Sequence, residues 1–399
     1  MYFAISIFTF CFLILISHFL SKSKKFEFID TRNSRFVTID GLRGYLATSV
    51  FFHHYIITWY WVNHGRWERP PETVYQNYGK VGVAIFFMIT GFLFVGKLMN
   101  DKGKTNWIKL YESRLFRIIP LYTFAVIVVS FIVFASSQFE INVNSLTLAK
   151  QYFHWVLFHG GQINDFQNTK LIIAAVDWTL KYEWLFYFSL PFISLIMVQP
   201  NKLYKIVILV FLPVFLYFKP IHIVSFNSVH LILFMVGGFT QFFVSIVQFP
   251  NKIVKSNALS IVVLILAIMS IGYSRTLSIE HIIIISLFFV FIAIGNDMFG
   301  IFSSKPSRML GEISYSIYLL HGIVLYVLFT YLKVVNINNI SLNTYMAMMP
   351  IVGSSVILIS SVTFLQIEKP SINFGRRNIL SSIPNRIMIL AIKSFHRTR

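Results

Sequence analysis

Residues 81–96 read VGVAIFFMITGFLFVG, a largely apolar run without a charged side chain. A helix needs roughly 20 mostly apolar residues to cross the bilayer core, and the surrounding segment 80–98 supplies them. Other segments of similar character lie at 2–20, 41–62, 118–136, 183–199, 203–219, 224–247, 257–273, 279–299, 311–332 and 343–366. The sequence therefore predicts an all-α fold, a polytopic transmembrane bundle of about 11 spans.

The composition excludes most other classes of protein. Of the 399 residues, 56% are hydrophobic and 12% are charged, whereas average proteins carry roughly 25% charged residues. A soluble globular enzyme is excluded on this ground. The net charge of +19 comes from short basic clusters between apolar runs, a pattern typical of membrane topology rather than of nucleic-acid binding. A single cysteine, Cys11, excludes a disulfide framework and a cysteine metal site, and we expect no metal.

The basic clusters also predict the orientation of the chain. The first segment is followed by SKSKK at 21–25 and not by a small-residue cleavage site, so we expect an uncleaved span with its N-terminus outside. Stretches 21–40, 97–117, 200–206, 248–256, 300–310 and 367–399 then face the cytoplasm and hold most of the lysine and arginine residues. The C-terminus falls inside, and residues 137–178 form the longest external loop.

Ionisable residues in the second span are the first candidates for function, because charge at membrane depth is costly. The span opens with IDGLRG at 39–44, including Asp40 and Arg43, and continues to His53 and His54. Eleven residues separate Arg43 from His54, a rotation of about three turns plus 20° and a rise of about 16.5 Å. Arg43 and His54 therefore share one helix face, and His53 points away. The alternative is that Arg43 reaches lipid phosphates and the histidines make interhelical contacts.

A second basic feature stands where the fourth span begins. Arg114 and Arg117 lie one helical turn apart. With Arg43 they can clamp a phosphate-rich ligand, since guanidinium groups bind phosphate in bidentate fashion. The alternative is an ordinary positive-inside loop.

Polar residues in two later spans complete the candidate set. Trp178, Glu183 and Tyr187 stand where the fifth span re-enters from outside, and a carboxylate among aromatic rings suits either a sugar hydroxyl or an interfacial aromatic belt. In the tenth span, Ser314, Tyr318 and His321 follow helical spacing beside Tyr315. They form either a functional stripe or a set of interhelical hydrogen bonds.

These stretches resemble the acyltransferase-3 family, bacterial integral-membrane enzymes that O-acylate glycans and other extracytoplasmic acceptors. The resemblance rests on IDGLRG with FHH at 52–54, VGVAIFFMITGFL at 81–93, RLFRIIP at 114–120, WTLKYE at 178–183, LGEISYSIYLLH at 310–321 and IEKP at 367–370. The motifs occur in the family's order between about residues 39 and 370. The likeness implies a membrane domain over 39–370, an extra N-terminal helix and basic linker over 1–38, and a basic cytoplasmic tail over 371–399.

The resemblance also implies roles for individual residues. His54 is implied as the essential histidine, with Glu183 as the acid of the WTLKYE motif, in which Thr179 replaces the usual serine. Arg43, Arg114 and Arg117 are implied to bind the acyl-CoA donor from the cytoplasm. Supporting or acceptor-binding roles are expected for Asp40, His53, Trp178, Tyr187, Ser314, Tyr315 and His321.

The expected function is acetyl transfer from acetyl-CoA, a co-substrate and not a bound cofactor, to a polysaccharide such as lipopolysaccharide O-antigen or to a lipid-linked glycan. The protein is expected in the bacterial cytoplasmic (inner) membrane, with the bilayer as partner and no nucleic acid. His54 acts either as a base or as a transiently acylated group. The rivals are a flippase or transporter for a lipid-linked glycan and a succinyltransferase of the same family. No P-loop, HExxH or GxSxG motif supports ATP-driven or soluble-hydrolase chemistry.

Overall fold

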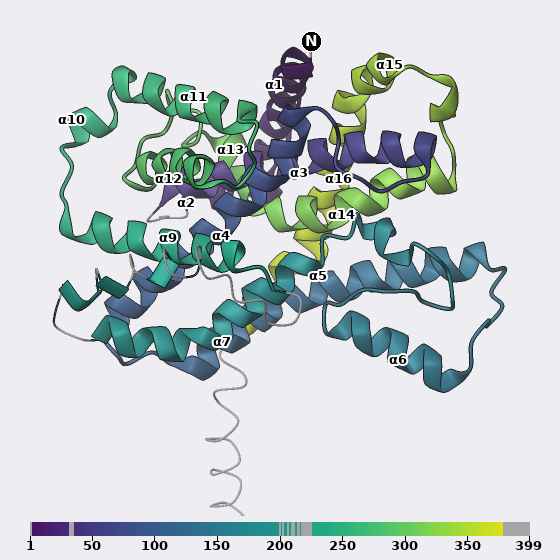
Figure 1. Ribbon diagram of the computed structural model, residues 1–399, viewed down its shortest axis with the longest axis horizontal. Helices are drawn as coiled ribbons and strands as arrows, with labels where there is room; N and C mark the ends of the chain where they lie inside the picture. The colour runs from purple at the N-terminus through teal and green to yellow at the C-terminus, as the bar shows by residue number, and fades with distance from the viewer. Residues whose placement is uncertain are drawn as a thin grey trace, which may run out of the picture.

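A computed structural model describes residues 2–31, 36–198 and 226–377, together with scattered residues between 201 and 216. Throughout these described residues the named elements are helices, and Ile163 and Phe166 form an isolated antiparallel β-bridge. Figure 1 shows α-helices crossing at many angles, with α6 lying beside α5. The described part of the chain thus has the all-α class that its apolar periodicity predicts.

The longer helices coincide with the predicted segments, except that segment 203–219 lies largely outside the described residues. They are α1 (Tyr2–Ser21), α3 (Val37–His64), α4 (Thr73–Asp101), α5 (Trp107–Ser136), α7 (Trp178–Val198), α9 (Ser228–Ile246), α11 (Asn257–Gly272), α12 (Ile279–Ala293), α14 (Ser314–Tyr326) and α16 (Met349–Thr363). Shorter helices are α2 (Phe28–Thr31), α6 (Ser145–Val156), α10 (Asn251–Val254), α13 (Lys305–Glu312), α15 (Leu342–Ala347) and α17 (Lys369–Gly375).

Six helical stretches in the described part of the chain are long and apolar enough to cross a membrane. They are Tyr2–Ser21, Thr73–Asp101, Trp107–Ser136, Ser228–Ile246, Ser314–Tyr331 and Met349–Gly375. The last two are continuous because π-helical turns, Val327–Tyr331 and Phe364–Glu368, extend α14 and α16. These helices support a multi-pass membrane protein, and the count of about 11 spans stays a prediction.

Helix α5 begins well before the predicted span at 118–136. Asn106 caps it, because its side-chain oxygen accepts a hydrogen bond from the backbone N–H of Lys109 at 2.9 Å. The helix then runs on through Pro120. Arg114 and Arg117 therefore lie within a continuous helix and not in a loop, which fixes the face on which their side chains project.

Two glycines allow the backbone of α3 to pack closely against neighbouring segments. A Cβ atom on Gly311 of α13 would lie 1.7 Å from the backbone oxygen of Asp40 in α3. A Cβ atom on Gly41 would lie 1.9 Å from the backbone oxygen of Phe302. Small residues allow this backbone-to-backbone approach, which is the usual way helices pack in membranes. The crossing sets the position of α3, which carries Arg43, His53 and His54.

Replacing Gly311 with alanine is expected to lower stability by about 1–3 kcal/mol, because the new methyl group forces α13 away from α3. Thermal unfolding of the purified protein in detergent measures the effect. Gly272→Ala is the matched control, since a Cβ atom there meets nothing within 4 Å. An unchanged melting temperature for Gly311→Ala would contradict the close crossing.

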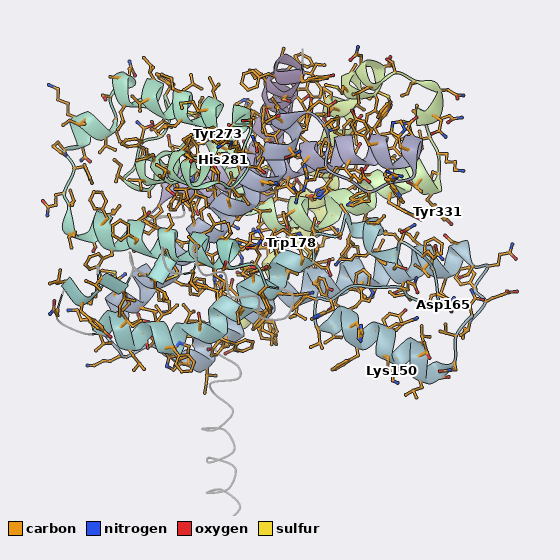
Figure 2. The ribbon with its side chains drawn as sticks, in the orientation of Figure 1. Lys150, Asp165, Trp178, Tyr273, His281 and Tyr331 are labelled. Atoms are coloured by element: carbon orange, nitrogen blue, oxygen red, sulfur yellow. The ribbon has the colours of Figure 1, made fainter. Side chains whose placement is uncertain are left out.

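A buried histidine joins α11 to α12. The backbone N–H of Leu277 donates to His281 Nδ1 at 3.0 Å, so the ring proton sits on Nε2 and is donated to the Ser270 carbonyl at 2.7 Å. Tyr273 stacks on the ring with centroids 5.2 Å apart (Figure 2). His281 thus uses both nitrogens to hold this connection together, and we assign it a structural role.

Candidate active site

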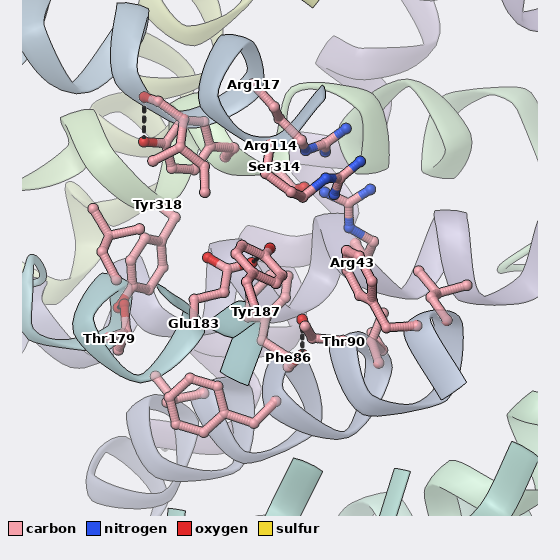
Figure 3. A pocket seen from close by; sticks show the side chains of 18 of the residues that line it. Arg43, Phe86, Thr90, Arg114, Arg117, Thr179, Glu183, Tyr187, Ser314 and Tyr318 are labelled. Atoms are coloured by element: carbon pink, nitrogen blue, oxygen red, sulfur yellow. Dashed lines mark hydrogen bonds between the residues drawn. The ribbon is translucent and has the colours of Figure 1, made fainter. Parts of the chain in front are cut away.

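A cavity of about 350 Å³ opens between helices α3, α4, α5, α7 and α14. Its polar lining includes most of the residues singled out in the sequence. Figure 3 shows the guanidinium groups of Arg43, Arg114 and Arg117 gathered at one end, and Tyr318 with Thr179 at the other. Aromatic and aliphatic side chains of α4 and α7 form the remaining wall.

The basic end of the cavity draws on two helices. Arg43 comes from α3, whereas Arg114 and Arg117 lie one turn apart on α5. The guanidinium carbon of Arg114 lies 5.2 Å from the centroid of the Phe94 ring, a cation–π contact that orients it. Three neighbouring cations repel one another unless an anion is shared between them, so this end suits a polyanionic ligand.

Two acids beside the basic end reduce this repulsion. Glu312 and Glu368 both lie within electrostatic reach of Arg43 and Arg117. Glu368 is 1% exposed, and one of its oxygens accepts a hydrogen bond from the Ser316 hydroxyl at 3.0 Å. It closes the π-helical turn Phe364–Glu368, a distortion frequent at functional sites. The sequence contains Glu368 in IEKP, but only the fold brings it to the arginines.

Glu183 lines the same cavity as the arginines. Its Oε1 accepts a hydrogen bond from the Tyr187 hydroxyl at 2.6 Å, one helical turn further along α7. The sequence suggested that Glu183 lies at the outer surface and places the acceptor. Helix α7 begins at Trp178, so Glu183 lies about 7.5 Å along it, and its role in placing the acceptor stays a prediction.

His54 does not line this cavity, although it shares a helix with Arg43. Its Nδ1 lies 3.1 Å from the Val50 carbonyl and 2.9 Å from His321 Nε2. The rings of His54 and His321 have centroids 5.0 Å apart. The spacing of eleven residues predicted a shared stripe facing one ligand, whereas the fold puts Arg43 in the cavity and His54 beyond its end.

Tyr318 lies between the cavity and the histidine pair. Its ring centroid is 6.3 Å from that of His321, one turn along α14. Its hydroxyl forms a hydrogen bond of 2.9 Å with the Thr179 hydroxyl, which closes the end of the cavity. Tyr318 is the side chain through which the two halves of the candidate site meet.

The other predicted residues divide between the cavity and its surroundings. Asp40, Ser314 and Tyr315 line the cavity, and the Tyr315 hydroxyl donates to the Ile118 carbonyl at 3.0 Å. His53 lies outside it, with Nδ1 at 2.8 Å from the Tyr75 carbonyl. Trp178 also lies outside, in an aromatic cluster with its ring centroid 5.0 Å from that of His230.

The structure also places a buried acid, Asp177, next to this site. In the sequence only its position directly before the WTLKYE motif marks it. Asp177 has no exposed surface, and burial raises the pKa of its carboxyl to about 6. Lys170 Nζ lies 3.7 Å from Asp177 Oδ1 and opposes the rise in pKa. Asp177 fixes the loop in front of α7, and hence the start of the helix that carries Glu183.

Comparison with known proteins places most of the chain in a family. A family profile described as an acyltransferase domain matches residues 36–365. The peptidoglycan O-acetyltransferase OatA of Listeria monocytogenes is 27% identical to the chain over 183 residues. That match covers 43% of this chain and 26% of the relative, so the chain spans about a quarter of the relative's length. No solved structure matches the chain.

The family profile covers the second predicted span, the RLFR pair, the WTLKYE segment and the LGEISYSIYLLH segment, which are the parts of the sequence that build the cavity and the histidine pair. The match begins and ends close to the limits of the motifs in the sequence. On this match the chain belongs to the acyltransferase-3 family.

Proposed function

We propose that the protein is an O-acyltransferase that moves an acetyl group from cytoplasmic acetyl-CoA to a hydroxyl of an extracytoplasmic polysaccharide or lipid-linked glycan. The observation that carries the proposal is the cavity with three arginines at one end and Tyr318, next to the His54–His321 pair, at the other. A donor with phosphates at one end and a thioester at the other fits this division.

The arginine end is proposed to hold the phosphates of acetyl-CoA. Guanidinium groups bind phosphate oxygens in bidentate fashion, and a buried site strengthens each contact. Glu183 and Tyr187, hydrogen-bonded to each other in the same cavity, then lie along the donor and not beside the acceptor. The acyl thioester extends toward Tyr318, which has to move for it to reach the histidine.

The histidine end is proposed to carry the chemistry. His54 takes the proton of the acceptor hydroxyl while the hydroxyl oxygen attacks the thioester carbonyl. The carbon–sulfur bond breaks, and the departing coenzyme A thiolate receives that proton. In the alternative order His54 is first acylated as the carbon–sulfur bond breaks, and the coenzyme A thiolate takes the ring proton. The acceptor hydroxyl then attacks the acyl-imidazole, and its proton returns to the imidazole ring as the carbon–nitrogen bond breaks. Both orders yield one O-acetyl ester and one free thiol.

The location follows from the same proposal. A donor made in the cytoplasm and an acceptor outside require a protein that spans the bacterial cytoplasmic (inner) membrane. The basic clusters favour an external N-terminus and a cytoplasmic C-terminus. The 39–370 membrane domain would carry the activity, and the added helix and linker over 1–38 and the tail over 371–399 would flank it.

The test is a label-transfer assay on the purified full-length protein in nanodiscs. The protein is incubated with acetyl-CoA labelled in the acetyl group and with lipid-linked glycan extract, and a parallel reaction contains labelled succinyl-CoA. We expect label in a base-labile ester and one free thiol for each ester formed. Succinyl transfer in place of acetyl transfer would change the donor assignment. Glycan movement across a vesicle membrane without thioester loss would overturn the proposal in favour of a flippase.

A further inference from the structure

The contact between His54 and His321 restricts where their protons can be. Both rings have a nitrogen near a backbone carbonyl of their own helix, and the two rings meet through one nitrogen each. A carbonyl oxygen only accepts hydrogen bonds, whereas a neutral imidazole has one donor and one acceptor nitrogen. These rules are enough to assign the proton on each ring.

His321 is assigned first. Its Nδ1 lies 3.0 Å from the Ile317 carbonyl, so Nδ1 carries the proton and donates it. In the neutral ring Nε2 is then an acceptor. His321 has no exposed surface, so water does not compete for this nitrogen. Nε2 points to His54 Nδ1 at 2.9 Å, within the usual range for a hydrogen bond.

The position of the proton on His54 follows from its position on His321. Its Nδ1 faces two acceptors, His321 Nε2 at 2.9 Å and the Val50 carbonyl at 3.1 Å. Both require the proton of His54 to be on Nδ1. The lone pair of Nε2 is then free, and no hydrogen bond from a described residue occupies it. His54 itself is partly exposed, unlike His321.

We infer that His321 is a positioning residue that holds His54 in the Nδ1–H form, so that Nε2 is the nitrogen that meets the acceptor hydroxyl. This rests on the proposed function and adds to it the reacting atom and its partner. An unconstrained neutral histidine side chain favours the opposite form, with the proton on Nε2, so an unassisted His54 would present the wrong nitrogen most of the time.

The hydrogen bond between His54 and His321 also stabilises His54 after it has taken the proton. When Nε2 takes the hydroxyl proton, His54 becomes a cation, and its Nδ1–H bond to the neutral His321 becomes charge-assisted and stronger. When the proton passes to the coenzyme A thiolate, the ring returns to the Nδ1–H form. If His54 is acylated instead, the acyl group is carried on Nε2 for the same reason.

Two variants of similar size separate this role from packing. In His321→Gln the side-chain oxygen reaches the place of Nε2 and can accept from His54 Nδ1. In His321→Asn the amide reaches only the place of Nδ1, so the contact to His54 is lost. We expect His321→Asn to lower kcat about 10²-fold, since general-base assistance is worth about 10²–10⁴-fold. His321→Gln should recover most of the lost kcat. In both variants KM for acetyl-CoA should stay within about twofold of the wild-type value.

The inference also has a test that needs no turnover. Nitrogen NMR of protein labelled in its histidine rings distinguishes a protonated nitrogen from a bare one, and the His54 signals are those lost in His54→Ala. We expect a protonated Nδ1 and a bare Nε2 in the wild type, and a shift toward Nε2–H in His321→Asn. A wild-type His54 protonated on Nε2 would overturn the inference. So would a His321→Gln variant that is folded and keeps this signature but is as inactive as His321→Asn.

The two proposals fail in different ways. If the wild-type protein transfers no acyl group under any condition, the proposed function is wrong, while the NMR result still decides the form of His54. If the wild type is active and the ring form is the opposite one, the function stands and the role of His321 falls.

Discussion

His54→Ala is expected to abolish acyl transfer, with a loss of about 10²–10⁴-fold or more. We expect this loss because His54 is the group proposed to take the proton of the acceptor hydroxyl or to accept the acyl group. His321 is not expected to substitute, because its side chain has no exposed surface for the acceptor hydroxyl to reach. The measurement is ester formation from labelled acetyl-CoA, with expression and melting temperature checked for each variant.

The matched control for this result is His64→Ala. His64 lies on the same helix, α3, and is exposed. It should keep close to wild-type activity, which shows that removing an imidazole from this helix is not harmful in itself. If His54→Ala retains substantial transfer in a folded protein, another group performs the chemistry and the assignment of His54 is wrong.

Arg117→Ala is expected to raise KM for acetyl-CoA by about 10–100-fold, because a hydrogen bond to a charged group contributes about 1.5–3 kcal/mol. Arg117→Lys should recover only part of this, since an ammonium group keeps the charge but lacks the planar fork. Initial rates at varied acetyl-CoA give KM and kcat separately. A change confined to kcat would indicate that Arg117 acts on the reaction step and not on the donor.

Lys109→Ala is the control for the arginine variants. Lys109 has the same charge, lies on the same helix α5 and is exposed. It tests whether any cation near this end of the helix attracts the anionic donor. Equal effects of Lys109→Ala and Arg117→Ala would mean that the arginines contribute only general positive charge, which contradicts a specific phosphate site.

The sequence predicts the helices well because a bilayer demands long apolar runs, and these are visible without knowledge of tertiary contacts. The start of α5 was missed because the segment before residue 118 is too polar for a hydropathy pattern, although Asn106 caps a helix there. The aromatic-rich start of α7 predicts a membrane boundary near Glu183, whereas its place in the cavity beside the arginines is visible only in the fold.

The candidate residues could be selected from the sequence, but their partners could not. Arg43 and His54 stand out by their spacing, and the arginine pair by its clustering. The His54–His321 contact joins residues 267 positions apart, and helical periodicity carries no information at that range. Likewise, only the fold brings Thr179 to Tyr318, a hydrogen bond between residues 139 positions apart.

The Tyr318–Thr179 hydrogen bond has a consequence for the cell as a whole. A bacterium stores energy as a proton gradient across its cytoplasmic membrane, and a continuous water-filled path through any abundant protein would discharge it. At this place one of two buried hydroxyls donates to the other, and the Val176 carbonyl lies within hydrogen-bond distance of both. The Phe86 ring packs beside them, with its centroid 6.2 Å from that of Tyr318. Under the proposed function, this closure would act as electrical insulation while the donor site is empty.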